Sequence, residues 1–95
     1  MHLPKKRIFI IGSLSQADKI AETAAYYAGD IYDVRYVRKE PEKTFEELVT
    51  QAFDNIEWAD IVMVVCKDDG VIGNGTTYEV EYAKRLKKQI IYKNL

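Results

Sequence analysis

The sequence has little of the chemistry on which several common classes of functional site depend. Its 95 residues include one cysteine and one histidine. Cys66 cannot form an internal disulfide, and its place at the end of an apolar run favours a buried structural thiol in a reducing, cytoplasmic environment. The single histidine, His2, stands in an N-terminal stretch that we expect to be loose. These counts exclude a histidine-based zinc site and a Ser-His catalytic triad.

An excess of charge of one sign is also absent. Fourteen basic and fifteen acidic residues give a net charge of -1. This balance provides no electrostatic attraction for a nucleic acid polymer or an anionic membrane. The apolar run at residues 8–11 is too short for a signal peptide or a membrane span. We therefore expect a soluble, cytoplasmic protein that has neither of these partners.

Strand and helix patterns alternate along the sequence, as is typical of one α/β domain. A hydrophobic content of 47% in a chain of this length fits a single domain over residues 1–95, with residues 1–6 as a loose lead. The expected strands are residues 7–11, 31–37, 61–66 and 89–92. Since the connections are of helix length, right-handed crossovers predict a four-stranded parallel sheet in the order 2-1-3-4. This is a flavodoxin-like three-layer sandwich.

Capping residues mark the ends of the expected helices. Ser13 or Ser15 can cap the first helix, which Gly29 terminates. Thr44 and Glu47 have the spacing of a capping box and open the second helix. The third helix follows a glycine-rich loop at residues 67–75 and ends in cations that suit the helix dipole.

Glu79 is the residue around which the candidate site is built. It follows the third strand and the glycine-rich loop, at the sheet edge where ligands bind in such folds. Its spacing from Ala83 and Leu86 places it on the inward helix face, where the helix N-terminus would keep its carboxylate ionised. Such a carboxylate suits nucleophilic attack on an anomeric carbon. Alternatively, Thr76 and Glu79 form a second capping box with a purely structural role.

Gly12 and Ser13 form a second candidate element at the end of the first strand. A glycine there lets a ligand approach the backbone, and the following helix N-terminus suits a phosphate or a sugar hydroxyl. The alternative is a simple strand-to-helix turn. Asp69, in the loop, could orient a sugar hydroxyl or bind a cation, although acids in loops are more often solvated turn residues. Tyr78 adjoins Glu79 and could line the pocket.

Three motifs, in chain order, resemble those of the nucleoside 2-deoxyribosyltransferase family and related nucleotide N-glycosidases. In that family the first strand ends in Gly-Ser or Gly-Pro, and the third strand begins Ala-Asp-Ile-Val. The pattern Gly-x-x-x-Glu-x-Gly-x-Ala follows. The matching positions here are Gly12, Ser13, residues 59–62, Gly75, Glu79 and Ala83. The resemblance covers nearly the whole chain.

This resemblance implies that Glu79 is the nucleophile that displaces the base from C1′ of a deoxyribonucleoside or its 5′-monophosphate. It implies a small-molecule nucleoside or nucleotide as substrate, a homodimer or larger homo-oligomer, and no metal or organic cofactor. Phe53 and Ile10 could line the part of the pocket that holds the base. The expected substrate-binding residues are Gly12, Ser13, Asp69, Gly75, Thr76 and Tyr78.

Three positions depart from the family pattern. Phe9 stands where the family has a tyrosine, Ala52 replaces its catalytic aspartate, and Glu81 replaces the glycine after the nucleophile. No general acid for the leaving base is therefore identified. This leaves open a second class, a nucleotide-binding or regulatory module without turnover. A phospho-receiver domain is less well supported, because it needs an acidic pair where Gly12 and Ser13 stand.

Overall fold

Four strands form one parallel sheet in the order β2-β1-β3-β4, which confirms the predicted topology. The computed structural model describes residues 5–36, 42–66 and 74–93. The strands are β1 (Lys6–Gly12), β2 (Tyr32–Tyr36), β3 (Ile61–Val65) and β4 (Gln89–Lys93). The helical segments are the 3-10 turn η1 (Leu14–Gln16), α1 (Ala17–Tyr27), α2 (Phe45–Trp58) and α3 (Asn74–Arg85).

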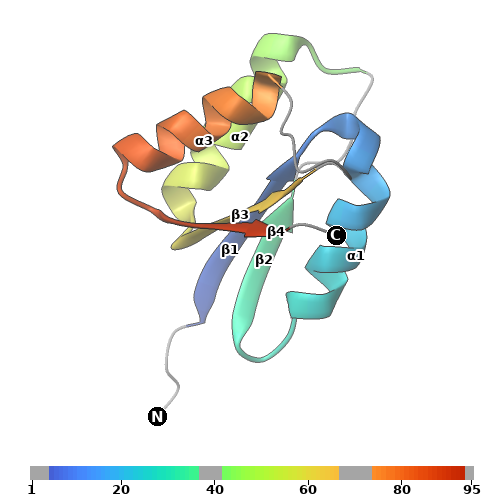
Figure 1. The fold of residues 1–95 in the computed structure, drawn as a ribbon, viewed down its shortest axis with the longest axis vertical. Coiled ribbons are helices and arrows are strands. Elements are labelled where there is room, and N and C mark those ends of the chain that lie inside the picture. Colours follow the sequence, from blue (N-terminus) through green and yellow to red (C-terminus); the bar gives the residue numbers. More distant parts are fainter. Residues whose placement is uncertain (1–4, 37–41, 67–73, 94–95) are drawn as a thin grey trace.

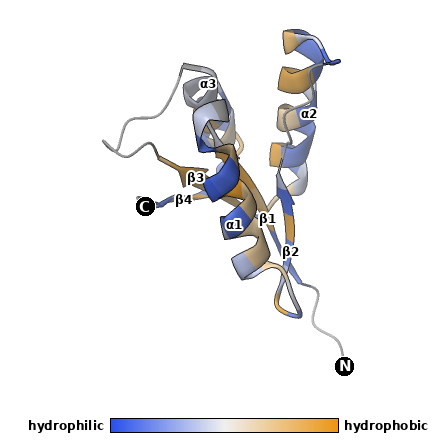
Figure 2. Cartoon of the chain, turned by 90° about the vertical axis from the view of Figure 1, so that its right-hand side faces the viewer, coloured by the Kyte–Doolittle hydropathy of each residue, from blue (hydrophilic) through white to orange (hydrophobic). Residues whose placement is uncertain are grey.

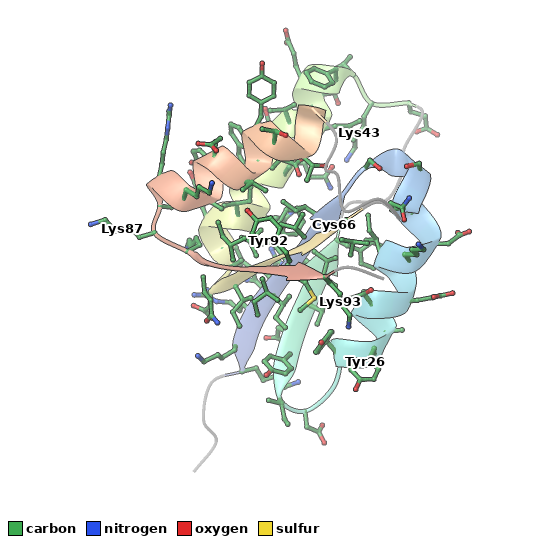
Figure 3. All side chains as sticks on the ribbon, viewed as in Figure 1. Tyr26, Lys43, Cys66, Lys87, Tyr92 and Lys93 are labelled. Carbon is green, nitrogen blue, oxygen red and sulfur yellow. The ribbon has the colours of Figure 1, made fainter. Side chains whose placement is uncertain are left out.

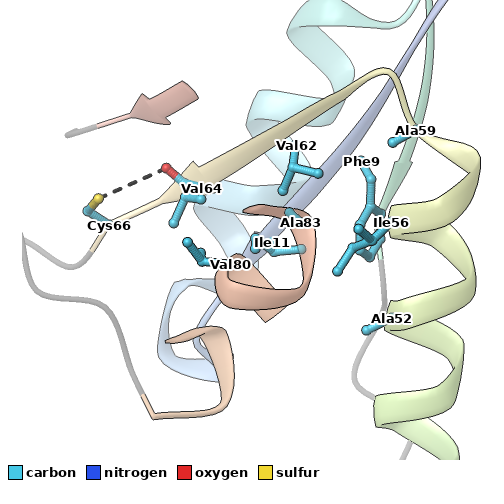
Figure 4. Close-up of a cluster of buried hydrophobic side chains, with 10 residues drawn as sticks. All are labelled: Phe9, Ile11, Ala52, Ile56, Ala59, Val62, Val64, Cys66, Val80 and Ala83. Carbon is cyan, nitrogen blue, oxygen red and sulfur yellow. Dashed lines mark hydrogen bonds between the residues drawn. The ribbon is translucent and has the colours of Figure 1, made fainter. Parts of the chain in front are cut away.

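The helices lie on both faces of the sheet and make a three-layer sandwich (Figure 1). Helix α1 covers one face, where Ile20 and Ala24 pack on Ile8 and Ile10. Helices α2 and α3 lie next to each other on the opposite face. The cluster beneath them is shown in Figure 4 and consists of Phe9, Ile11, Ala52, Ile56, Ala59, Val62, Val64, Cys66, Val80 and Ala83.

Strand β3 is the centre of both clusters. Its five residues are apolar and none is more than 6% exposed, and the strand is hydrophobic along its length in Figure 2. Successive side chains of a strand point to opposite faces. Val62 and Val64 therefore pack under α2 and α3, whereas Met63 packs under α1. Such a run without alternation is what a central parallel strand requires.

The sheet begins earlier in the chain than the sequence predicts. Lys6 belongs to β1 and lies in register with Tyr32 of β2, while Lys5 forms an ion pair with Asp33. The prediction of a loose lead over residues 1–6 is therefore wrong at Lys6, which belongs to the strand, and residues 1–4 lie outside the described residues. Strand β2 is shorter than predicted, since Ile31 is in the preceding turn and is 71% exposed.

The helix ends agree with the predicted caps only in part. The capping box of α2 is confirmed, because the Glu47 amide donates to the Thr44 hydroxyl at 3.1 Å and the Glu47 carboxylate accepts from the Thr44 amide. Helix α1 has no side-chain cap, because the turn η1 precedes it and the Gln16 amide donates to the Ser13 carbonyl. At its other end Ala28 is extended and forms a bridge with β2.

No helix within the described ranges is both long enough and apolar enough to cross a bilayer.

The C-terminus of α3 ends in a left-handed residue that is not glycine. Lys87 has a φ of 57°. The Lys88 amide donates to the Ala83 carbonyl and the Lys87 amide donates to the Lys84 carbonyl, each at 3.0 Å. These two bonds are those of a Schellman motif, in which the residue at the position of Lys87 is usually glycine. A side chain in this conformation costs roughly 1–2 kcal/mol.

We predict that Lys87→Gly stabilises the protein, because glycine adopts the left-handed conformation without steric cost. The free energy of unfolding, measured by urea denaturation, should rise by up to about 1 kcal/mol after the entropy of the unfolded glycine is taken into account. Arg85→Gly, in the last turn of the helix itself, is the matched control and should lower it by about 1 kcal/mol. A Lys87→Gly protein less stable than the wild type would contradict the assignment.

Candidate functional site

A pocket of about 340 Å³ opens between α2 and α3. This volume is within the range of small-molecule sites, and such sites are mainly apolar with a few polar groups that set orientation. The lining residues are Phe45, Val49, Phe53, Gly75, Tyr78 and Glu79. Among the described residues of this lining, only Glu79 carries a carboxyl group. The pocket therefore brings together three of the predicted site residues, Gly75, Tyr78 and Glu79, with the predicted wall residue Phe53.

Helix α2 contributes an apolar stripe of which the sequence analysis identified only Phe53. Phe45, Val49 and Phe53 are spaced four residues apart, so they lie above one another on one side of the helix. This stripe is separate from Ala52 and Ile56, which are buried against the sheet. The spacing is visible in the sequence, but it does not tell which neighbouring helix the stripe faces.

Helix α3 presents Glu79 towards α2. Thr76, Val80 and Ala83 are its buried residues, none more than 4% exposed, and Val80 and Ala83 pack on the sheet. Glu79 is only partly buried and lies beside this stripe, in the wall of the pocket. The expectation that Glu79 points onto the sheet is thus corrected, because the smaller residues of the helix occupy that face.

The alternative capping box at the start of α3 is wrong. The helix begins at Asn74, so Thr76 is already inside its first turn and is 4% exposed. Within the part of the chain that the structure describes, the Glu79 carboxylate makes no hydrogen bond and no ion pair. A purely structural capping role for Glu79 is therefore not found.

Burial raises the pKa of the Glu79 carboxyl from its ordinary 4.5 to about 7. The cause is desolvation, since the apolar walls replace water around the carboxyl and penalise its charged form. The sequence predicted instead that the helix dipole would keep this group ionised. Glu79 is the sixth residue of α3, and the influence of the dipole falls off within the first turn. Near pH 7 the carboxyl is accordingly present in both protonation states.

An aromatic stack joins the two helices at one side of the pocket. The rings of Phe53 and Tyr82 are 4.2 Å apart and inclined by 8°. The Tyr82 hydroxyl donates a hydrogen bond to Glu57 on α2, and this bond raises the pKa of Tyr82 above its usual value. The stack fixes how closely α2 and α3 approach. At the mouth of the pocket, Phe45 and Tyr78 are each 72% exposed.

Gly12 and Ser13 are not among the residues that line this pocket. Gly12 ends β1 at a point where a methyl group would come within 3.0 Å of both the Ile20 side chain and the Val65 carbonyl oxygen. Close packing of α1 on the sheet therefore accounts for a glycine here. The Ser13 hydroxyl lies 2.8 Å from that of Ser15. Asp69 lies outside the described residues.

Other residues proposed from the sequence lie in the core. Thr76 is buried and does not line the pocket. Ile10 packs beneath α1, on the opposite face of the sheet, so the prediction that it walls a base is wrong. Phe9 and Ala52 are both buried in the cluster beneath α2 and α3 (Figure 4). The two positions at which the family has a tyrosine and an aspartate are thus filled by apolar packing.

Among residues 5–36, 42–66 and 74–93 there is no group of three or more His, Cys, Asp or Glu side chains that could hold a metal ion.

Comparison with known proteins gives a likeness in structure and none in sequence. No protein-family model and no curated protein matches the chain. The chain is similar in structure to the CMP N-glycosidase of Clostridium botulinum, with a TM-score of 0.69 and 19% identity, over 92% of this chain and 67% of that chain. It is also similar to a 2-deoxyribosyltransferase from Leishmania mexicana, with a TM-score of 0.74 and 18% identity, over 94% and 64%. The fold is therefore shared, and this chain spans about two thirds of the length of both proteins.

The raised pKa of Glu79 predicts a pH-dependent stability. The folded protein holds the Glu79 proton more tightly than the unfolded chain, so stability from this group falls as the pH rises from 4.5 to about 7 and is constant above that. The total loss is on the order of 3 kcal/mol. Glu79→Gln is neutral at all these pH values. It should abolish this fall and be more stable than the wild type at pH 8 in urea denaturation.

Glu81→Gln is the matched control for this experiment. Glu81 is on the same helix, its side chain is 60% exposed and it lies 3.5 Å from Lys84. Its replacement should leave the pH dependence of the wild type unchanged. If the free energy of unfolding changed equally with pH in the wild-type and Glu79→Gln proteins, this would show that solvent reaches the Glu79 carboxyl.

Proposed function

We propose that this protein cleaves or transfers the N-glycosidic bond of nucleosides or nucleotides, with Glu79 as the nucleophile. The observation that carries the proposal is the carboxyl group of Glu79, which pairs with no described residue and lies in an apolar pocket of about 340 Å³, with a pKa raised to about 7. The fold that the chain shares with a nucleotide N-glycosidase and a deoxyribosyltransferase supports the same class of reaction.

In the proposed reaction the ionised carboxylate of Glu79 attacks C1′ of the sugar. A bond forms between the carboxylate oxygen and C1′ as the bond from C1′ to the base nitrogen breaks, and the base leaves with the electron pair. Water supplies the proton that the base takes up, because no acid in the described residues is placed to do so. Attack of water on C1′ then breaks the bond between C1′ and the Glu79 carboxylate, which gives hydrolysis and regenerates Glu79, and attack of a second base in place of water gives transfer.

The walls of the pocket suit the base of such a substrate. Phe45, Phe53 and Tyr78 offer aromatic surfaces, and flat heterocycles stack on such surfaces. Apolar walls also raise the nucleophilicity of an ionised Glu79, because they remove its hydration. As part of the proposal, Gly12 and Ser13 bind the sugar or 5′ group from the end of β1, with Asp69 and Gly75 as further binding residues, whereas the buried Thr76 takes no part.

A second candidate is a nucleotide-binding or regulatory module of the same fold. The burial of Ala52 favours this candidate, because Ala52 stands where the resembling family has its catalytic aspartate. Ala52 is 3% exposed and packs with Phe9 in the core. Within the described ranges no carboxylic acid other than Glu79 lines the pocket. Such a site would bind a nucleotide and not protonate the leaving base, so the two candidates differ in turnover and agree in binding.

Release of free base from purine and pyrimidine deoxynucleosides and their 5′-monophosphates tests the proposal. The wild type should release base, and Glu79→Gln should reduce the rate by roughly 10³-fold or more, as expected for loss of a nucleophile. Because the nucleophile must be ionised, the wild-type rate should rise as the pH passes about 7 and then reach a plateau. Glu81→Gln should retain the wild-type rate.

The same proteins separate the two candidates. No base release from the wild type, together with a higher melting temperature in the presence of nucleotide, would identify the binding module. Base release that Glu79→Gln leaves intact would show that another residue is the nucleophile. Neither release nor a shift in melting temperature would overturn both candidates.

A further inference from the structure

The pocket between α2 and α3 holds an acid without a counter-charge. Among the residues that the structure describes, none donates a hydrogen bond to the Glu79 carboxyl or forms an ion pair with it. Helix α2 contributes only apolar side chains to the lining, and α3 adds Gly75 and Tyr78. Charges taken out of water are normally paired. A ligand that carries a positive charge would supply the partner that the ionised carboxyl lacks.

Aromatic rings are the second feature of the pocket that suits a cation. Three of the described lining residues are aromatic, namely Phe45, Phe53 and Tyr78. Phe53 stacks on Tyr82, whereas Phe45 and Tyr78 are each 72% exposed and keep ring surface free for a ligand. The face of an aromatic ring attracts a cation, and sites for quaternary ammonium groups combine several rings in this way.

Open space lies beside the Glu79 carboxyl. Gly75 precedes Glu79 by four residues in α3, so the two positions lie above one another on the same side of the helix. A side-chain carbon added at Gly75 would meet no atom within 4 Å. A flat ring can therefore lie next to the carboxyl and still contact the aromatic residues at the mouth of the pocket.

The chemistry of the leaving group leads to the same kind of ligand. A neutral base that leaves C1′ with the electron pair becomes an anion unless an acid protonates it. Within the described ranges, no lining residue other than Glu79 carries a carboxylic acid, and Ala52 is buried in the core. A base whose ring nitrogen at C1′ is already positively charged leaves as a neutral molecule. Such a base needs no acid.

We propose that the pocket takes nucleosides whose base is a permanent cation, such as a pyridinium or an N-alkylated purine. This inference rests on the proposed function and names its substrate class. The Glu79 carboxylate forms a bond to C1′, and the bond from C1′ to the charged ring nitrogen breaks. Its electron pair goes to that nitrogen and cancels the positive charge. Water then attacks C1′, frees the Glu79 carboxylate and gives up a proton to solvent.

Two isomeric ligands test the preference for positive charge without turnover. 1-Methylnicotinamide is a pyridinium cation, whereas N-methylnicotinamide carries the same methyl group on its amide and is neutral. Neither has a sugar, so neither reacts. Isothermal titration calorimetry of the wild type at pH 8 should give a dissociation constant lower by roughly tenfold or more for the cation. Glu79→Gln should remove this difference. Equal affinity of the wild type for both isomers, or binding of neither, would overturn the inference.

The affinity for the cation should follow the ionisation of Glu79. Burial raises the pKa of this carboxyl to about 7, so at pH 5 roughly one molecule in 100 carries the charge. The dissociation constant for 1-methylnicotinamide should therefore be roughly 100-fold higher at pH 5 than at pH 8. Among the other titratable side chains of the two helices, Tyr78 lines the pocket, and Tyr82 is bonded to Glu57 beside it. Glu79→Gln should lose this pH dependence, and a wild type without it would contradict the inference.

Leucine variants test the aromatic rings, because leucine keeps the apolar surface and removes the attraction for a cation. Phe45→Leu and Tyr78→Leu should each weaken binding of 1-methylnicotinamide roughly two- to fivefold. Tyr26→Leu is the matched control. Tyr26 is 78% exposed and belongs to α1, on the other side of the sheet from the pocket (Figure 3). Unchanged affinity in both pocket variants, or an equal loss in Tyr26→Leu, would contradict the assignment of the cation to this pocket.

Turnover of a cationic nucleoside separates this inference from the proposed function. The wild type should cleave the 2-deoxyriboside of a pyridinium with a kcat/KM roughly 100-fold or more above that for neutral purine and pyrimidine deoxynucleosides, because a general acid contributes roughly 10²–10⁴-fold to their cleavage. Cleavage of the neutral nucleosides at an equal or higher rate would overturn the inference and leave the proposed function standing. Selective binding of the cation with no base release from any nucleoside would overturn the proposed reaction and leave the pocket as a site for cationic bases.

Discussion

Burial of β3 on both faces is the constraint on which the rest of the structure depends. A strand whose five residues are all apolar must be covered by helices on both sides, because either face left in water would expose a row of valine, isoleucine or methionine side chains. Helix α1 covers one face, and α2 and α3 together cover the other. Two helices that share one face meet along a groove, and the pocket that contains Glu79 lies in that groove.

The chemistry of the pocket follows from this packing. The aromatic stack of Phe53 on Tyr82 holds the two helices together, and the apolar stripe of α2 takes water away from the Glu79 carboxyl. Desolvation then raises the pKa of the carboxyl to about 7, which lets one group be ionised or protonated near neutral pH. A perturbed acid in an apolar pocket is a functional-site candidate on physical grounds. Position 52 is alanine and supplies no acid to the leaving base. Binding of a nucleotide therefore does not by itself imply turnover.

The sequence predicted the features that depend on local patterns. The apolar run of β3 and the capping box at Thr44 each follow from a few neighbouring residues, and the sheet order follows from the alternation of strand and helix patterns along the chain. All three are confirmed. The misses concern tertiary placement. Ile10 lies under α1 because side chains alternate along a strand, and local sequence does not say which helix covers which face. Phe45 and Val49 were missed for the same reason, since a stripe at helical spacing does not name its partner.

The most direct test of the account is an NMR titration of the Glu79 carboxyl carbon, assigned by its absence from the spectrum of Glu79→Gln. The account states that the apolar walls of the α2–α3 pocket desolvate this carboxyl without providing a partner. It predicts a midpoint near pH 7 for the Glu79 carboxyl. A midpoint close to the ordinary value of 4.5 would contradict it, because it would mean that water or a donor group stabilises the charged carboxylate in the folded protein.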